Sequence, residues 1–226
     1  MQFSKSTINI LKNFQTINGS ILVKTGNQLE TISATKNILA SAEIGETFEK
    51  EFGIYDLSEF LNVLTSENFL GADCEFKEGH VVFSKGRGIS NYVYADSSTI
   101  VSPENKVNMP DPEISFTLTQ EDLSAVRNMS SVLGKGDLSV VGDGENISLS
   151  VLDKRDPKLN NYSLNVGDVH HEKFTMYFKV ENLKIIGGDY NVQISSGGIS
   201  YLKHTEIPVE YWIALEPDSW YGENAE

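Results

Sequence analysis

Residues 3–26 read FSKSTINILKNFQTINGSILVKTG, and the spacing of their apolar side chains indicates how the chain begins to fold. Apolar residues recur near the 3.6-residue period of a helix, which predicts one buried stripe. Ser4 or Ser6 can cap this helix, and Asn18-Gly19 can end it. The stripe consists of Ile8, Leu11, Phe14 and Ile17.

A second face of the same helix is cationic and rich in amides. It carries Lys5, Asn9, Lys12 and Thr16, which are spaced by four, three and four residues. Residues 1–29 contain three lysines and no acid, although the whole chain has 32 Asp and Glu and a net charge of −14. We interpret the segment as a local cationic feature on an anionic protein. The alternative is an ordinary solvated face that happens to lack acids.

Length and composition limit the class of protein. With 226 residues, 39% of them hydrophobic, the chain can build one or two cores, and its composition argues against wholesale disorder. The net charge argues against an ordinary nucleic-acid-binding surface and against binding to anionic lipid. The single cysteine, Cys74, cannot form an internal disulfide, which fits a reducing compartment, and no apolar run is long enough to span a membrane. We expect a soluble intracellular protein.

The second half of the chain repeats the order of the first. Thr119 can cap a helix whose apolar stripe includes Leu123, Val126 and Leu133, as the serines near residue 4 can cap the first helix. Residues 56–64 and 181–186 predict a shorter second helix in each half, the latter closed by Gly187-Gly188. Short alternating strands fill the intervals, four before each shorter helix and three after it.

These observations predict a duplicated α+β fold, with two helices on a largely antiparallel sheet in each copy. We expect a first domain at residues 1–98, an interdomain linker at 99–112 that carries Pro103, Pro110 and Pro112, and a second domain at 113–226.

Motifs for catalysis or metal binding are weak. His170-His171 lacks a third ligand at a suitable spacing, and Gly134-Lys135-Gly136 lacks the frame of a phosphate loop. Asp143-Gly144-Glu145 does not meet the spacing of a calcium loop, and Cys74 is expected to be a buried thiol. We therefore expect no enzyme activity, no metal and no cofactor.

Three segments resemble one known family. They are residues 3–26, the IYDLSEFLNVL run at 54–64 and the closing EYWIALEPDS at 210–219. In these segments, and in its length and duplication, the chain resembles the sliding clamps of large tailed bacteriophages, which are DNA-polymerase processivity factors. The resemblance implies a closed homotrimeric ring whose six similar domains place helices inside and sheets outside.

A size estimate agrees with that implication. A domain of about 113 residues has a radius of gyration near ~13 Å, so six such domains in a ring leave a hole of roughly 30 Å. Four domains would leave about 10 Å, which is too narrow for a duplex of roughly 20 Å. Chains with two domains must therefore assemble as three or more copies to encircle DNA.

The resemblance also implies which residues face DNA. Lys5 and Lys12 match the basic positions of the family's first helix, and Arg127 lies on the repeated helix. A few exchangeable phosphate contacts from such cations would permit sliding. Lys179 and Lys184 are equally well explained as ordinary solvated lysines. The complete predicted DNA-facing set is Lys5, Lys12, Arg127, Lys135, Lys179 and Lys184.

Two further surfaces are implied by the family. Its partners insert a short hydrophobic peptide into an apolar pocket, for which we expect Ile100, Val101, Val107, Met109 and Trp220; alternatively these residues only hold the linker and tail on the core. Subunits are expected to join through strand edges at 90–95 and 162–166, with Tyr92, Tyr94, Tyr162 and Leu164 at the interface.

The leading hypothesis is a non-enzymatic clamp that encircles double-stranded DNA without sequence preference and tethers the viral DNA polymerase. The resemblance implies an ATP-dependent clamp loader as a partner, a possible second role in late transcription, no membrane partner, and the cytoplasm of the infected bacterial host as its location. One alternative is an acidic, β-rich phage structural protein of the tail or baseplate. The other is an enzyme of unrecognised type, which would need a concave site with perturbed titratable groups.

Overall fold

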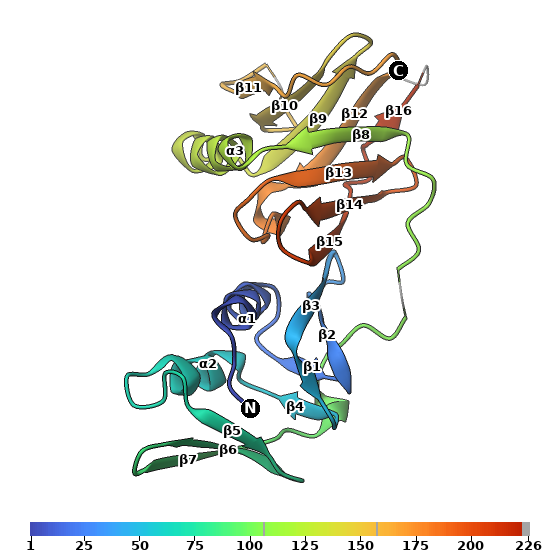
Figure 1. Cartoon of the computed structure of the whole chain (residues 1–226). Coiled ribbons are helices and arrows are strands. Elements are labelled where there is room, and N and C mark those ends of the chain that lie inside the picture. The colour runs from blue at the N-terminus through green and yellow to red at the C-terminus, as the bar shows by residue number, and fades with distance from the viewer. Residues whose placement is uncertain (106, 157, 223–226) are drawn as a thin grey trace. The chain divides into compact units, whose positions relative to one another are not determined.

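The computed structural model describes residues 1–105, 107–156 and 158–222. The chain divides into two compact units, Met1–Lys106 and Val107–Glu226 (Figure 1). Each unit combines α-helix with antiparallel β-sheet, as the sequence predicts. No helix in the described part of the chain is long and apolar enough to cross a membrane.

The first unit begins with its longer helix and continues through short antiparallel ladders. Strand β1 pairs with β4, β2 pairs with β3, and β6 lies between β5 and β7. The elements are α1 (Lys5–Ile17), β1 (Ile21–Val23), β2 (Gly26–Ile32), β3 (Ile38–Phe48), β4 (Phe52–Ile54), α2 (Leu57–Thr65), β5 (Asp73–Phe76), β6 (His80–Lys85), β7 (Gly88–Val93) and a 3-10 turn at Ser97–Thr99.

Both helices of the first unit are defined by their caps and apolar faces. The Ser4 side chain accepts a hydrogen bond from the Thr7 amide, and Asp56 accepts one from the Glu59 amide. Helix α1 packs against α2 and β3 through a buried face (Figure 1). That face consists of Thr7, Ile10, Leu11, Phe14 and Ile17, whereas Ile8, expected in the stripe, is only half-buried.

The second unit contains one longer helix and two antiparallel ladders. In one ladder the strand order is β11-β10-β9-β12-β16, and in the other β15, β14, β13 and β8 are successive neighbours. The elements are β8 (Ile114–Leu118), α3 (Gln120–Leu133), β9 (Asp137–Asp143), β10 (Ile147–Leu152), β11 (Tyr162–Asn165), β12 (Lys173–Lys179), a 3-10 turn at Val180–Asn182, β13 (Tyr190–Ser195), β14 (Ile199–His204), β15 (Val209–Ala214) and β16 (Trp220–Tyr221).

Helix α3 begins as predicted. Thr119 caps it, and the side chain of Asp122 bonds back to the Thr119 amide, which completes a capping box. Gly134 ends the helix in the left-handed conformation, with φ of 62°.

The predicted helix at residues 181–186 is wrong: the structure has a 3-10 turn at Val180–Asn182, followed by irregular chain. Two carbonyl oxygens of this segment, those of Leu183 and Ile185, accept hydrogen bonds from Arg127 instead of helical amides. Gly187-Gly188 follow at once, so too few residues remain to propagate a helix. The second unit therefore keeps the duplicated topology but replaces its shorter α-helix by a turn.

Candidate nucleic-acid interface

The cationic face of α1 is fully exposed. Lys5, Asn9, Lys12 and Thr16 all lie on the solvent side, opposite the buried face. The two lysines are seven residues apart, a rise of about 10 Å along the helix axis. No carboxylate of the described residues pairs with either ammonium group. Both charges are therefore available to an external anion.

A buried carboxylate on β3 holds the start of α1. Glu46 is 7% exposed and accepts hydrogen bonds from the Ser4 amide and the Thr7 hydroxyl. Burial by itself raises the pKa of Glu46, but the hydrogen bonds from Thr7 and Ser4 outweigh it and bring the pKa below its ordinary value. A carboxylate is also favoured near the amides of a helix N-terminus. Glu46 thus fixes the turn that carries Lys5.

We predict that Glu46→Gln lowers the free energy of unfolding at neutral pH by about 1–3 kcal/mol, because the amide is a weaker acceptor of one buried and one part-buried hydrogen bond. The folded-state pKa lies below the unfolded one, so the wild-type contribution is present above the unfolded pKa and is lost as pH falls through the folded pKa. Urea unfolding between pH 7 and pH 3 should show a smaller pH dependence in the variant. Identical pH profiles would contradict this role.

Arg127 is engaged within its own unit. Its guanidinium is half-buried and donates from Nη2 to the carbonyl oxygens of Leu183, at 2.5 Å, and Ile185, at 2.9 Å. Desolvation by burial lowers the pKa of Arg127. Its main contacts are therefore to the chain that replaces the expected helix.

We expect Arg127→Met to reduce the free energy of unfolding by about 2–3 kcal/mol, because two carbonyl groups lose a charged donor. Denaturant unfolding of the variant and of a matched Arg127→Lys protein measures this effect. Lysine keeps the charge but cannot reproduce the planar guanidinium. Unchanged stability of both variants would show that the two bonds contribute nothing.

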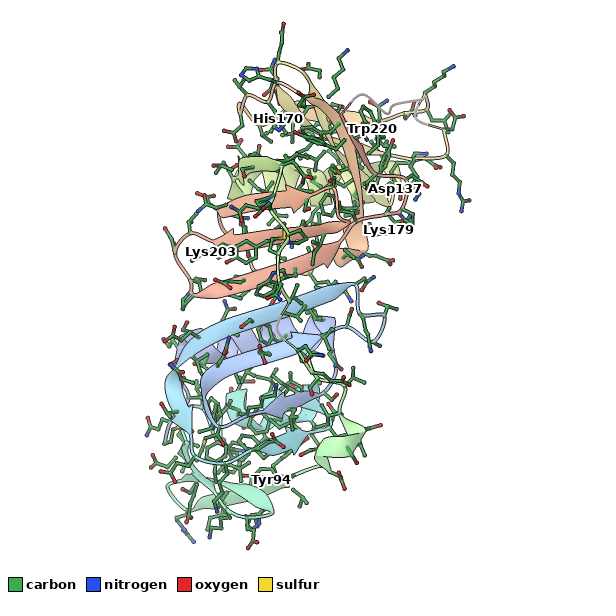
Figure 2. All side chains as sticks on the ribbon, turned by 90° about the vertical axis from the view of Figure 1, so that its right-hand side faces the viewer. Tyr94, Asp137, His170, Lys179, Lys203 and Trp220 are labelled. Atoms are coloured by element: carbon green, nitrogen blue, oxygen red, sulfur yellow. The ribbon has the colours of Figure 1, made fainter. Side chains whose placement is uncertain are left out.

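The other predicted cations of the second unit lie in different surroundings. Lys135 lies 3.8 Å from the Asp153 carboxylate, and its side chain is 17% exposed. Lys179 bonds to Asp137 at 2.5 Å (Figure 2). Lys184 is exposed. The structure thus brings Lys5 and Lys12 together on one helix face, whereas the cations of the second unit are spread over several elements.

Lys179 belongs to an ion network that the sequence analysis missed. Lys154 contacts Glu216 and Asp218, each at 2.9 Å, and Lys179 lies 3.8 Å from Glu216. Burial by itself raises the pKa of Asp137. The hydrogen bonds from the Lys154 amide and the Lys179 ammonium lower it by more, so the pKa lies below its ordinary value. The salt-bridged partners are up to 64 residues apart in sequence (Lys154 and Asp218), so no local spacing could have revealed the network.

The residues expected to line a peptide pocket have diverse environments. Ile100 is buried against Gly53, where an added Cβ would lie 2.5 Å from its Cδ1. Val101 is 47% exposed, and its carbonyl accepts a bond from Asn18. Val107 and Met109 are half-buried, and Trp220 is half-buried in β16, where it pairs with Thr175 of β12.

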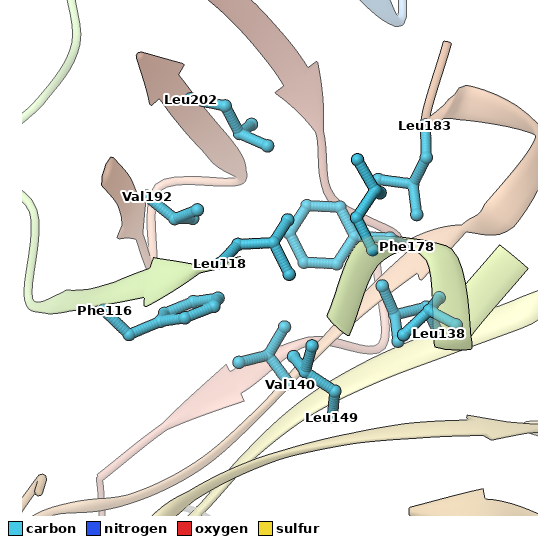
Figure 3. Close-up of a pocket in the computed structure, with 11 residues that line it drawn as sticks. Phe116, Leu118, Leu138, Val140, Leu149, Phe178, Leu183, Val192 and Leu202 are labelled. Carbon is cyan, nitrogen blue, oxygen red and sulfur yellow. The ribbon is translucent and has the colours of Figure 1, made fainter. Parts of the chain in front are cut away.

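Cavities occur elsewhere among the described residues. One, of about 30 Å³, lies inside the second unit (Figure 3) and has an entirely apolar lining that includes Phe116, Leu123 and Phe178. Its small volume and buried lining mark it as a packing gap in the core. Another, of about 260 Å³, lies in the first unit beside Phe48, Phe52 and Phe76.

The residues expected at subunit interfaces lie on or beside edge strands. Tyr92 packs on Phe60 with ring centroids 5.3 Å apart and donates to the Asp56 carbonyl at 2.9 Å. Tyr94 stacks on Phe52, and its buried hydroxyl has no hydrogen-bond partner among the described residues. Desolvation raises the pKa of Tyr94 to about 12. Tyr162 and Leu164 are half-buried on β11, opposite Val151 and Leu149.

The histidine and cysteine side chains considered for metal binding or reactivity have structural environments. His170 Nδ1 accepts from the Glu172 amide at 3.1 Å, and its Nε2 lies 3.0 Å from the Glu113 carbonyl oxygen. Cys74 is buried, and desolvation raises the pKa of its thiol to about 11. The described residues contain no cluster of three His, Cys, Asp or Glu side chains that could hold a metal ion.

Comparison with known proteins covers almost the whole chain. Residues 4–102 match the family described as DNA polymerase processivity factor, and residues 115–217 match the family described as gp45 sliding clamp, C terminal. The sliding clamp of Vibrio phage KVP40 is 34% identical over 96% of this chain and 99% of its own length. The sliding clamp of Enterobacteria phage T4 is 28% identical over 97% and 98%, respectively.

Comparison with solved structures also finds the clamp fold. A chain in the structure titled "C-terminal region of FEN-1 bound to A. fulgidus PCNA" superposes with a TM-score of 0.71, at 11% identity, covering 94% of this chain and 96% of that one. At this identity the likeness shows the fold alone. The two family matches and the 34% identical phage relative show that the chain belongs to the phage sliding-clamp family of DNA polymerase processivity factors.

Proposed function

We propose that three copies of this chain close into a ring that encircles duplex DNA and tethers the viral DNA polymerase during replication. The observation that carries the proposal is the exposed face of α1, where Lys5 and Lys12 have no acidic partner among the described residues, in a chain of net charge −14. Such a face, turned to a central channel, would contact phosphates without reading sequence.

Acidic outer surfaces and a few inner cations suit a clamp that must slide. Each phosphate neutralised adds affinity, so many tight contacts would hold the ring in one place. We propose Lys5 and Lys12 as the main DNA contacts. Lys184 is exposed and stays a candidate; Arg127, Lys135 and Lys179 contribute less than the α1 lysines because each already bonds within the chain.

The subunits are proposed to join edge to edge, through β7 of one copy and β11 of the next. Tyr92, Tyr162 and Leu164 are half-buried at these edges, so a neighbouring strand would complete their burial. Tyr94, whose hydroxyl has no hydrogen-bond partner among the described residues, lies directly after β7. Partner proteins would dock a hydrophobic peptide near the exposed Val101, with Val107, Met109 and Trp220 as further candidates.

Its partners and setting follow from the same proposal. The ring is opened and loaded by an ATP-dependent loader, acts in the cytoplasm of the infected bacterium, catalyses no reaction itself and can also serve late transcription. The matches of both halves to clamp families favour this function over a tail or baseplate protein and over an enzyme.

The native mass tests the ring. Three chains of 25.1 kDa give about 75 kDa, and we expect that mass in native mass spectrometry or sedimentation at micromolar concentration. A stable species of the mass of one chain under these conditions would contradict the ring.

A further inference from the structure

Strand β7 presents an open edge in the first unit. It pairs with β6, and no described strand lies on its other side. Two large apolar side chains on its outward face are largely in water: Ile89 is 70% exposed and Val93 is 73% exposed. An open strand edge with exposed apolar residues is a template for another strand.

Strand β11 presents the matching edge in the second unit. It pairs with β10 alone among the described strands. Its side chains alternate between half-buried Tyr162 and Leu164 on one face and exposed Ser163 and Asn165 on the other. Both parallel and antiparallel pairing of β11 with β7 could bring the half-buried side chains of the two strands together. These side chains alone therefore do not determine the relative direction of the two strands.

Charge distinguishes the two ends of β7. At its start, the hairpin carries the exposed cations Lys85 and Arg87; the Lys85 ammonium bonds to the carbonyl oxygens of Glu67 and Leu70. At its end, the Tyr92 hydroxyl reaches the carbonyl of Asp56, at the N-terminus of α2. Asp56 and Glu59 there are both exposed acids, and α2 carries no basic residue.

Charge also distinguishes the two ends of β11. The β10–β11 loop, which leads into its start, carries Arg155 and Lys158, both exposed. Asp156 in this loop accepts a bond from the Lys158 amide. Lys154 is neutralised by Glu216 and Asp218, and Asp153 lies near Lys135. Among the described residues, Arg155, Lys158 and Asp156 form no salt bridge. Beyond the end of β11 lies Asp168.

We propose that Arg155 and Lys158, which lie between β10 and β11 of one copy, dock against Asp56 and Glu59 on the N-terminal turn of α2 in the next copy. This inference rests on the proposed ring. Antiparallel pairing brings the start of β11 beside the end of β7, so the loop cations meet the α2 acids. It also brings Asp168 to the end of β7 that carries Lys85 and Arg87.

Parallel pairing would give the opposite result. It would place Arg155 and Lys158 beside Lys85 and Arg87, and Asp168 beside Asp56 and Glu59. Like charges brought together at an interface disfavour that arrangement strongly, whereas opposite charges speed association and fix its direction. A head-to-tail interface of this kind closes into a ring when its rotation allows.

The test is a charge swap measured by self-association. Arg155→Glu with Lys158→Glu should raise the dissociation constant of the assembly at least roughly tenfold at moderate salt. Adding Asp56→Asn with Glu59→Lys to the same chain should restore assembly to within about threefold of wild type. Asparagine keeps the cap of α2 while removing its charge.

A control variant, Lys36→Glu with Lys50→Glu, makes the same change in net charge at exposed sites outside both edges, and should assemble as wild type does. Equal weakening in the control, no weakening in the loop variant, or no rescue by the swap would each overturn the docking proposal while leaving a ring of about 75 kDa intact. A wild-type chain that stays monomeric would instead overturn the ring itself.

Discussion

Reversing the two lysines of α1 should abolish most of the clamp-dependent synthesis. In the proposed trimer, Lys5→Glu with Lys12→Glu replaces six cations at the proposed DNA-facing positions by six anions. Because sequence-independent binding to DNA is largely electrostatic, we expect processive synthesis by the cognate polymerase to fall at least roughly tenfold at moderate salt. Both side chains are exposed, so the fold and the native mass should be unchanged.

The matched control for this experiment is Lys50→Glu with Lys203→Glu. It changes the net charge equally, at exposed positions outside α1. Product lengths on a primed circular template, with loader and ATP, should match wild type for the control and shorten for the α1 variant. Equal processivity of the α1 variant and wild type would contradict the assignment of Lys5 and Lys12 to DNA.

The second large effect concerns the side chain that holds α1 in place. Phe14 is fully buried on the inner face of the helix. We expect Phe14→Ala to lower the free energy of unfolding by about 3–5 kcal/mol, because it removes a large apolar side chain and leaves a cavity. A loss of this size is a large fraction of the stability of an ordinary domain, so the first unit should be largely unfolded near its normal melting temperature.

Phe14→Leu is the control for that change. It keeps an apolar side chain and should cost about 1–1.5 kcal/mol. Denaturant unfolding followed by circular dichroism measures both variants. A loss below about 1 kcal/mol for alanine would mean that the α1 interface is not a close-packed core.

Local sequence patterns were enough for the helices with strong caps and regular stripes. Thr119 and Ser4 mark the starts of α3 and α1, and periodic apolar residues mark their buried sides. Duplication was visible because the same signals recur in the same order. The exposed positions of Lys5 and Lys12 follow from helical spacing alone.

Contacts between residues far apart in sequence could not be predicted. Glu46 reaches the α1 N-terminus across 42 residues of sequence, and Lys179 finds Asp137 at the same separation. The sequence predicts a helix at 181–186, but the structure has a turn at Val180–Asn182. The carbonyl groups beyond this turn accept hydrogen bonds from Arg127, which lies on α3, rather than from helical amides. In each case a side chain distant in sequence supplies the hydrogen-bond partner, so the local spacing of residues does not predict the contact.

Topological retention tests the ring around DNA most directly. The protein is loaded with the cognate loader and ATP on a nicked circular duplex, and the DNA is then cut once and separated from free protein by gel filtration. A closed ring predicts that the protein stays with the circle and is lost from the linear form, from whose ends it can slide. Equal retention on both forms would show binding to the surface of DNA rather than encirclement, and would contradict the account.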